Sequence, residues 1–348
     1  MKNKPHETPC AEGISKNLSA QNYVRNLHAG WNLGNTLDAI CREKENPTPA
    51  EQETAWHNPM TTRAMIQLVK DAGFDMLRVP VTWYQQIGED HVIKKEWMDR
   101  VQEVVDYGMD SGLTVILNLH HENWHFPSDE NYPAASTRMK AVWQQIAQRF
   151  RDYDNRLIFE AMNEPRKTQT PVEWTGGDEE GRRVVMQLNK DFVDTVRATG
   201  GNNATRMLMV PTYAACSEDN GMFDFVPPAD ENIIVSLHCY PPVDFALLDD
   251  MNENQWTPAC DKELDELFTR VDKYFLSKGI PVIMGECGAR DKNNPADRVA
   301  WAKSYMRRAR KYGVPSIWWD NGGKEFEWML RKELAWKYPD MVAAFLEK

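Results

Sequence analysis

Several features are missing from this 348-residue sequence, and each absence excludes a class of protein. No hydrophobic run reaches the ~20 residues that a membrane-spanning helix needs. The first residues, MKNKPHETPCAEG, lack the apolar segment of a signal peptide. Positive charge is also scarce, because 52 acidic residues outnumber 41 Lys and Arg and give a formal net charge of -11. We therefore expect neither a membrane protein nor a protein that binds nucleic acid.

Cysteine is sparse as well, and its six positions form no C-x-x-C pair. A zinc ribbon and a thioredoxin-like motif are therefore excluded. A chain of this length does not need disulfides to fold, so we expect free thiols, with a Cys10–Cys41 bridge as the alternative. No Pro/Ser-rich linker, internal repeat or low-complexity tract interrupts the chain. We expect one domain over residues 19–348, preceded by an N-terminal extension (1–18) that could be disordered.

Short β-rich runs alternate with longer amphipathic helical patterns along the chain. Strands are expected at 28–33, 74–79, 113–119, 157–162, 206–211, 232–237, 281–286 and 315–320. Helices are expected at 61–73, 95–112, 137–153, 181–200, 262–279 and 295–313. Eight strands that are mostly apolar on both faces predict an α/β fold, a parallel sheet closed into a (β/α)8 TIM barrel. A doubly wound open sheet is the alternative, although its G-x-G-x-x-G phosphate fingerprint is missing.

The segment HENWH, from His121 to His125, fits the H-E-x-x-H pattern of zinc proteases. That pattern needs a helix to bring residues i and i+4 to one face. Here the segment directly follows the β-rich run LTVILNL, and Pro127 comes too early for a long helix to continue. We therefore favour another use of the segment, in which the third strand delivers Asn118, His120 and His121 to the mouth of the barrel.

Two glutamates stand where barrel enzymes carry their catalytic residues, after strands. Glu164 follows the fourth strand in FEAMNEP, and Glu286 ends the seventh in MGECGA. Strands three apart in an eight-stranded barrel lie nearly opposite each other, so these two carboxylates are expected to face each other across the mouth. Paired carboxylates are the machinery of glycoside hydrolysis, in which one donates a proton and the other stays ionised. The sequence therefore favours a glycosidase.

Other side chains at the strand ends could complete such a site. Arg78 is a candidate cation for holding Glu286 ionised, and an aromatic face can pack against the C–H bonds of a pyranose ring. Further candidates are Asn163, His238, Tyr240 and Trp319, with Trp124 and Trp256 as sugar platforms farther out. Long polar loops at 38–60, 122–136, 165–180, 212–231 and 239–261 mostly follow strands, on the face where barrel active sites are built.

Seven segments, in this order, resemble glycoside hydrolase family 5. They are GWNLGNTLDA (30–39), MLRVPVTW (76–83), LNLHHENW (117–124), FEAMNEP (159–165), HCYPP (238–242), GECGA (285–289) and WWDNG (318–322). The resemblance runs from about residue 20 to 346. The first segment and PTYAA (211–215) look most like the endoglucanase and xyloglucanase branch rather than the mannanase branch. The resemblance implies a retaining (β/α)8 hydrolase that needs neither a metal nor another cofactor.

The resemblance also implies a role for each matching residue. Glu164 would be the general acid/base and Glu286 the nucleophile. Arg78 and Tyr240 would contact Glu286. The sugar-binding residues would be His120, Asn163, His238 and Trp319, with Asn35, His121 and Asn321 as contacts to neighbouring glycone sugars. We therefore expect a retaining endo-β-1,4-glucanase that hydrolyses cellulose-type glucan, mixed-linkage β-glucan or xyloglucan, with its two carboxyls about 5–5.5 Å apart.

The alternatives are a β-mannanase of the same fold, a polysaccharide-binding protein that has lost catalysis, and a zinc metalloprotease. The presence of both glutamates argues against lost catalysis. A polysaccharide too large to enter a cell implies a secreted, extracellular enzyme. We expect a monomer whose partner is the β-linked polysaccharide, with no nucleic-acid or membrane partner.

Overall fold

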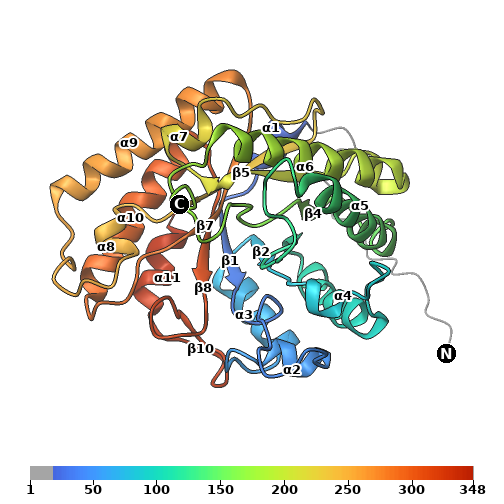
Figure 1. The fold of residues 1–348 in the computed structure, drawn as a ribbon. Helices are drawn as coiled ribbons and strands as arrows, with labels where there is room; N and C mark the ends of the chain where they lie inside the picture. The colour runs from blue at the N-terminus through green and yellow to red at the C-terminus, as the bar shows by residue number, and fades with distance from the viewer. Residues whose placement is uncertain (1–18, 348) are drawn as a thin grey trace.

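The computed structural model describes residues 19–347, and the strands of its main sheet lie at the centre of a ring of helices (Figure 1). The strands are β1 (Ala29–Leu33), β2 (Met76–Val79), β3 (Thr114–Asn118), β4 (Leu157–Glu160), β5 (Leu208–Cys216), β6 (Ile233–Cys239), β7 (Val282–Cys287) and β8 (Ser316–Asp320). Each strand pairs with the next in parallel, and β8 pairs with β1, so the sheet closes. The predicted single-domain (β/α)8 barrel is therefore confirmed, and the open sheet is excluded.

Helices cover the outside of the barrel. The longer ones are α3 (Arg63–Ala72), α4 (Lys95–Asp110), α5 (Tyr132–Arg149), α6 (Glu179–Ala198), α9 (Pro258–Tyr274), α10 (Pro295–Tyr312) and α11 (Pro339–Leu346). The shorter elements are α1 (Ala20–Val24), α2 (Pro49–Glu53), α7 (Asp219–Met222), α8 (Val243–Ala246), η1 (Tyr84–Gln86), η2 (Gly201–Ala204), η3 (Leu276–Lys278), β9 (Met329–Leu330) and β10 (Ala335–Trp336).

Local signals in the sequence explain where α3 begins and ends. The side chain of Thr62 accepts a hydrogen bond from the backbone N–H of Met65, which satisfies a donor that the first turn leaves open. Gly73 ends the helix in the left-handed conformation, with a φ of 106°. Both residues lie in the helical segment that the sequence predicts, so the expected and observed boundaries agree closely.

Several other boundaries differ from the sequence prediction, among them both ends of α9, which runs from Pro258 to Tyr274 rather than over 262–279. α5 begins at Tyr132 rather than 137, because Pro133 fits the first turn of a helix, where its missing N–H costs nothing. β5 continues to Cys216 through a bulge in which Ala214 and Ala215 have positive φ values of 54° and 49°. Alanine rarely adopts that conformation, so local sequence does not predict the bulge. The expected loops at 122–136 and 212–231 are correspondingly shorter.

The interior of the barrel changes from apolar to polar along each strand. The apolar layer contains Met76, Ile116, Ile158, Ile234 and Ile317, and Ala20, Tyr23 and Val24 of α1 pack beneath it. Two residues further along the same strands come Arg78, Asn118, Glu160, Ser236 and Trp319. Residues i and i+2 of a strand face the same side. The barrel therefore has a dry floor and, at the carboxyl ends of its strands, a polar layer on which a site can be built.

The remaining predictions about the chain concern thiols, membranes and the N-terminus. Five cysteines, at positions 41, 216, 239, 260 and 287, are free thiols. Burial raises the pKa of Cys239 to about 12, so this thiol stays protonated at neutral pH. Cys10 and the expected extension 1–18 lie outside the described residues. Across residues 19–347, the helices are all too short or too polar to cross a membrane.

Candidate active site

Arg78 lies at the centre of the polar layer, and its side chain is fully buried. Its Nε donates to Glu160 Oε2 at 2.7 Å, and its Nη1 donates to Glu286 Oε1 at 2.9 Å. The same Nη1 donates to Asn32 Oδ1, and Nη2 donates to Asn163 Oδ1. A buried charge is tolerated only when it is paired and hydrogen-bonded. This one cation therefore fixes two carboxylates and two amides at the barrel mouth.

Glu160 is a component of this site that the sequence prediction missed. It is fully buried on β4 and accepts hydrogen bonds from Arg78, from Asn118 Nδ2 at 3.1 Å and from Ser236 Oγ at 2.6 Å. A glutamate inside the otherwise apolar run LIFEAM is a signal that could have revealed it, because buried charges need partners. The hydrogen bonds from Asn118 and Ser236 fix the carboxylate of Glu160, which in turn holds the guanidinium of Arg78 in place.

Glu164 and Glu286 come together at the mouth, with His238 between them. His238 Nδ1 lies 2.8 Å from Glu164 Oε1 and 3.6 Å from Glu286 Oε2. One side-chain atom of each of these three residues lies within 4.8 Å of the other two. Tyr240 donates its hydroxyl to Glu286 Oε2 at 2.9 Å. The structure thus brings together the predicted glutamates from β4 and β7 and the predicted residues from β2 and β6.

The charges of these three groups shift one another's pKa values. Burial opposes charging of His238, but the carboxylates of Glu286 and Glu164 outweigh it and raise the pKa of His238 above its ordinary value. Burial would raise the pKa of Glu164, but the hydrogen bond and charge of His238, together with Arg166, bring it below its ordinary value. Burial raises the pKa of Glu286, while His238 and Arg78 oppose that rise. These charges therefore favour the protonated form of His238 and the ionised form of Glu164, which share a 2.8 Å hydrogen bond.

An aromatic wall borders these carboxylates. The rings of His120 and Trp319 are stacked in parallel, with centroids 5.6 Å apart, and His121 contacts His120 edge-on at 4.4 Å. Burial lowers the pKa of His121 to about 4 and that of His120 well below its usual range, so both imidazoles are neutral at pH 7. Asp38 lies 3.9 Å from His121 Nε2. This wall offers a flat apolar face beside neutral hydrogen-bonding groups, which suits an uncharged sugar.

The H-E-x-x-H segment does not form the helix that a zinc protease requires. β3 ends at Asn118, and no helix follows before α5 begins at Tyr132. Glu122 accepts hydrogen bonds from the backbone N–H of Trp83 and from the indole of Trp124. The metalloprotease alternative is therefore wrong in its geometric premise.

Two other groups of side chains within residues 19–347 bring metal-binding atoms within 4.8 Å of one another. They are Asp38, His120 and His121, and Glu164, His238 and Glu286. In the second group, the guanidinium of Arg78 already contacts Glu286 at 2.9 Å. In the first, the carboxylate of Asp38 accepts hydrogen bonds from the backbone N–H groups of Asn35 and Thr36. In each group, hydrogen bonds from the protein already hold one carboxylate in place. These hydrogen bonds explain the arrangement of the side chains without a metal ion.

Four residues predicted to contact sugars lie on the loops that follow the strands, and their role stays a prediction. They are Asn35, Asn321, Trp124 and Trp256. Asn58 Nδ2 donates to the carbonyls of both Asn35 and Asn321, at 2.9 Å each, and so ties the loops after β1 and β8 together. The side chain of Asn321 accepts a hydrogen bond from the backbone N–H of Gly323. The outer platforms are half-buried: Trp124 lies edge-on to His125, and Trp256 lies edge-on to Phe245.

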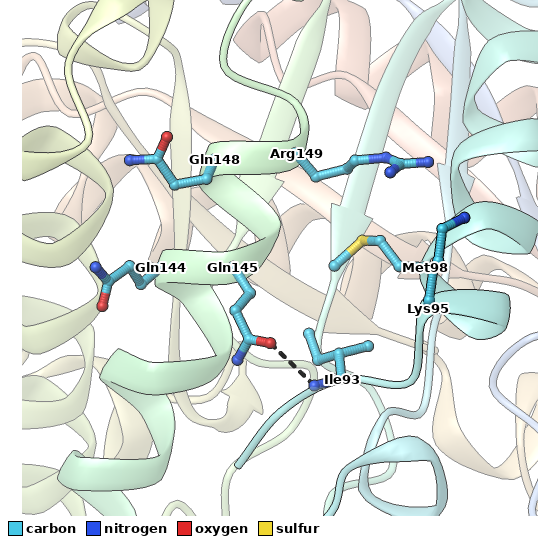
Figure 2. A pocket seen from close by; sticks show the side chains of 7 residues that line it. All are labelled: Ile93, Lys95, Met98, Gln144, Gln145, Gln148 and Arg149. Carbon is cyan, nitrogen blue, oxygen red and sulfur yellow. Dashed lines mark hydrogen bonds between the residues drawn. The ribbon is translucent and has the colours of Figure 1, made fainter. Parts of the chain in front are cut away.

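A separate hollow lies on the outer wall between α4 and α5 (Figure 2). Its lining residues are Ile93, Lys95, Met98, Gln144, Gln145, Gln148 and Arg149. Gln145 Oε1 accepts a hydrogen bond from the backbone N–H of Ile93, and its amide donates to the carbonyls of His91 and Ala141. This lining contains no carboxylate, and the side-chain amide of Gln145 already forms hydrogen bonds with the protein backbone. The chemistry therefore belongs to the barrel mouth.

Comparison with known proteins identifies the family. The model of the family described as Cellulase (glycosyl hydrolase family 5) matches residues 41–325. The chain belongs to glycoside hydrolase family 5. The predicted family and the predicted class of enzyme, an O-glycosyl hydrolase, are therefore confirmed.

The relatives of this family 5 enzyme resemble it over most of its length. Endoglucanase B of Neocallimastix patriciarum is 44% identical over 347 residues, which cover 95% of this chain and 72% of the relative. The chain spans 40% of the length of the cellulase/esterase CelE of Acetivibrio thermocellus and 86% of that of an endoglucanase A of Ruminococcus albus.

Two solved structures align over almost their whole length. A GH5-4 broad specificity endoglucanase from Ruminococcus champanellensis with bound cellotriose is 45% identical, with a TM-score of 0.92, and the match covers 95% of this chain and 99% of that one. A xyloglucan-specific endo-beta-1,4-glucanase, XEG5A, from a metagenomic library, in complex with cellotriose, is 38% identical, with a TM-score of 0.90, and the match covers 94% and 98%.

The loop after β4 of this family 5 enzyme adds a cation that the sequence prediction did not include. Arg166 Nη1 donates to the carbonyl of Glu164 at 2.9 Å and lies 3.5 Å from Glu164 Oε2. Its Nε donates to Glu173 Oε1 at 3.1 Å. Arg166 therefore contacts one of the two facing carboxylates from the loop after β4.

Proposed function

We propose that this chain is a retaining endo-β-1,4-glucanase, with Glu286 as the nucleophile and Glu164 as the general acid/base. The observation that carries the proposal is the cluster of Glu164, His238 and Glu286, whose side-chain atoms come within 4.8 Å of one another. Retaining glycosidases hold their carboxyls about 5–5.5 Å apart, whereas inverting ones need about 6.5–9.5 Å to admit a water. The close approach supports direct attack by one carboxylate.

In the first step, a carboxylate oxygen of Glu286 attacks the anomeric carbon. The bond from that carbon to the leaving oxygen breaks, and Glu164 donates its proton to this oxygen. His238 Nδ1 lies 2.8 Å from Glu164 Oε1, so the imidazole can share this proton with Glu164 before the transfer and take it back after the second step. Arg78 and Tyr240 both donate to Glu286, and donors stabilise the ionised form that attacks. The product is a glycosyl ester on Glu286 and a free sugar on the leaving side.

In the second step, water replaces the sugar that has left. Glu164, now ionised, removes a proton from this water, whose oxygen attacks the anomeric carbon. The ester bond to Glu286 breaks, and the carboxylate returns to the hydrogen bonds of Arg78 and Tyr240. Two inversions at one carbon give net retention. No step calls for a metal ion or another cofactor.

We propose cellulose-type glucan, mixed-linkage β-glucan and xyloglucan as the substrates. The endoglucanases among the relatives and the xyloglucan-specific neighbour support this range. None of the relatives described above is named a mannanase, so mannan is not proposed. Trp319 would be the floor of the subsite at the cleavage point, with His120 and Asn163 binding its hydroxyls. Because these polymers do not enter cells, we propose that the enzyme acts outside the cell, as a monomer.

Release of reducing sugar from barley mixed-linkage β-glucan, with a chelator present, tests this proposal. We expect the wild-type protein to be active, and Glu286→Gln to lose nearly all turnover without a change in thermal unfolding. The matched control is Glu266→Gln, whose carboxylate pairs with Lys262 on the exposed surface of α9. Loss of wild-type activity to the chelator, or near-normal activity of Glu286→Gln, would contradict the proposal.

A second assay separates the two glutamates. An acid is not needed when the leaving group is a good one, so Glu164→Ala should still form the glycosyl-enzyme from a dinitrophenyl β-cellobioside. Added azide should then replace water and release a β-cellobiosyl azide. Absence of azide rescue in Glu164→Ala, or its appearance in Glu286→Ala as the β-anomer, would reverse or remove these assignments.

A further inference from the structure

Gly34 lies where the first and last strands of the barrel meet. β1 and β8 are neighbours in the closed sheet (Figure 1), and their last residues, Leu33 and Asp320, are paired. Gly34 follows Leu33 directly, and its backbone N–H donates to the carbonyl of Asp320 at 3.0 Å. The first residue of the loop after β1 is thus tied to the end of β8.

A side chain at position 34 would have no room. A Cβ placed on Gly34 would lie 2.8 Å from both Cζ2 and Cη2 of Trp319, and 2.8 Å from the carbonyl oxygen of Asp320. Carbon atoms in contact are normally about 3.5–4.0 Å apart, so the indole occupies the space that a Cβ would need. The φ of Gly34 lies outside the left-handed region. Glycine is therefore required here by the close approach of the ring and not by the backbone conformation.

The backbone of Asp320 is fixed and cannot give way. Its buried carboxylate accepts hydrogen bonds from the indole of Trp31 and from the backbone N–H groups of Gly322, Trp328 and Met329. Arg331, itself buried, donates to the carbonyl of Asp320 at 2.7 Å and to the carbonyl of Gly34 at 3.0 Å. A buried polar group that loses its partner is costly, so this network holds the backbone on both sides of the contact.

The ring of Trp319 is held more weakly than the backbone around it. Within residues 19–347, its indole N–H has no hydrogen-bond partner. The ring is stacked on the imidazole of His120, with an angle of 2° between the planes and 5.6 Å between the centroids. A Cβ at position 34 would therefore displace the indole before it displaced the backbone, and the parallel arrangement with His120 would be lost.

We propose that Gly34 is a positioning residue for Trp319, because the missing Cβ sets the tilt of the indole on which the sugar at the cleavage point packs. This inference rests on the proposed function, in which Trp319 is the floor of that subsite. A pyranose presents a flat face of C–H bonds, and its contact with an aromatic ring depends on how the two faces are aligned. Gly34 keeps the indole parallel to His120 and so presents the flat face that the sugar meets.

A double-mutant cycle tests this role. We expect Gly34→Ala to lower kcat/KM for an aryl β-cellobioside roughly ten-fold. Trp319→Phe has a shorter ring that does not reach the positions of Cζ2 and Cη2, although it lowers activity by itself. In the Trp319→Phe background, Gly34→Ala should therefore change kcat/KM less than about two-fold. A merely structural effect of Gly34→Ala would be the same in both backgrounds.

Gly88 offers a matched control for the substitution. A Cβ on Gly88 would also come within 2.8 Å of its nearest neighbour. That neighbour is Oδ1 of Asp90, which is the end of an exposed side chain that can move aside. Gly88→Ala should therefore leave kcat/KM unchanged, both alone and together with Trp319→Phe.

The outcomes separate this proposal from the proposed function. An equal loss of kcat/KM in both backgrounds, or wild-type kinetics in Gly34→Ala, would refute the positioning role of Gly34. If Gly34→Ala does not fold by itself, folding of the double variant with Trp319→Phe would support the role, because the ring is then the obstacle. Failure of both variants to fold would refute it, since the obstacle is then the carbonyl of Asp320. A wild-type protein that hydrolyses no β-glucan would instead refute the proposed function.

Discussion

Tyr240→Phe removes one hydrogen bond to Glu286 and leaves the rest of its surroundings intact. Tyr240 Oη donates to Glu286 Oε2 at 2.9 Å, and burial raises the pKa of this phenol well above its usual range, so it remains a donor at every working pH. Arg78 continues to donate to the other oxygen of Glu286. The substitution therefore isolates a single interaction with the ionised carboxylate.

The magnitude follows from the kind of bond. A hydrogen bond to a charged group contributes about 1.5–3 kcal/mol, and 1.36 kcal/mol corresponds to one pKa unit. Loss of a donor disfavours the ionised form, so the pKa of Glu286 should rise by about 1–2 units. Glu286 must be ionised to attack. The acid limb of kcat/KM should therefore move to higher pH by that amount, while the alkaline limb stays in place.

The assay is kcat/KM for an aryl β-cellobioside across the pH range in which the protein is folded. Tyr107→Phe is the matched control, because its hydroxyl also donates to a glutamate, Glu103 Oε1 at 2.7 Å, but on the outer surface of α4. The control should reproduce the wild-type profile. An acid limb that does not move in Tyr240→Phe, with thermal unfolding unchanged, would refute the proposed role of this bond.

Three further substitutions test the surroundings of the site. Glu160→Gln should lower kcat at every pH and also lower the melting temperature, since it leaves the buried cation Arg78 with one fewer charged partner. Unchanged kinetics would show that Arg78 does not need its ion pair with Glu160. Arg206→Met should cost about 3–5 kcal/mol in the free energy of unfolding, measured by urea denaturation, because Arg206 is buried and donates to four backbone carbonyls. Trp319→Ala should reduce kcat/KM for an aryl β-cellobioside without a change in thermal unfolding, because it removes the ring that stacks on His120; wild-type kinetics in this variant would contradict the proposed role of Trp319.

The fold could be predicted from the sequence because each element carries its own local pattern. The eight strands are mostly apolar on both parities, and helices such as α3 have a cap at one end and a glycine at the other. The bulge at Ala214 and Ala215 could not be predicted, since nothing about alanine favours a positive φ. The surrounding barrel imposes that conformation: the backbone N–H of Ala214 donates to the carbonyl of Pro165 and ties β5 to the loop after β4.

The candidate site could be predicted where strand order alone brings residues together. Glu164 follows β4 and Glu286 lies near the end of β7, on nearly opposite sides of the barrel, and Arg78 lies in β2, which the closed barrel brings near both. Arg166 could not be found in this way, because it belongs to a loop whose path is set by contacts with Tyr213 on another strand. Sequence position within a long loop does not reveal which side chain turns back toward the mouth.

The most direct test of the central claim is to trap the intermediate that it requires. A 2-deoxy-2-fluoro-β-cellobioside with a good leaving group slows the second step more than the first, so the glycosyl-enzyme should accumulate. After digestion with a protease, mass spectrometry should find the added 2-fluorocellobiosyl mass on the peptide that contains Glu286, and the label should be absent from Glu286→Gln. A label on another residue, or time-dependent turnover with no covalent adduct, would contradict the account.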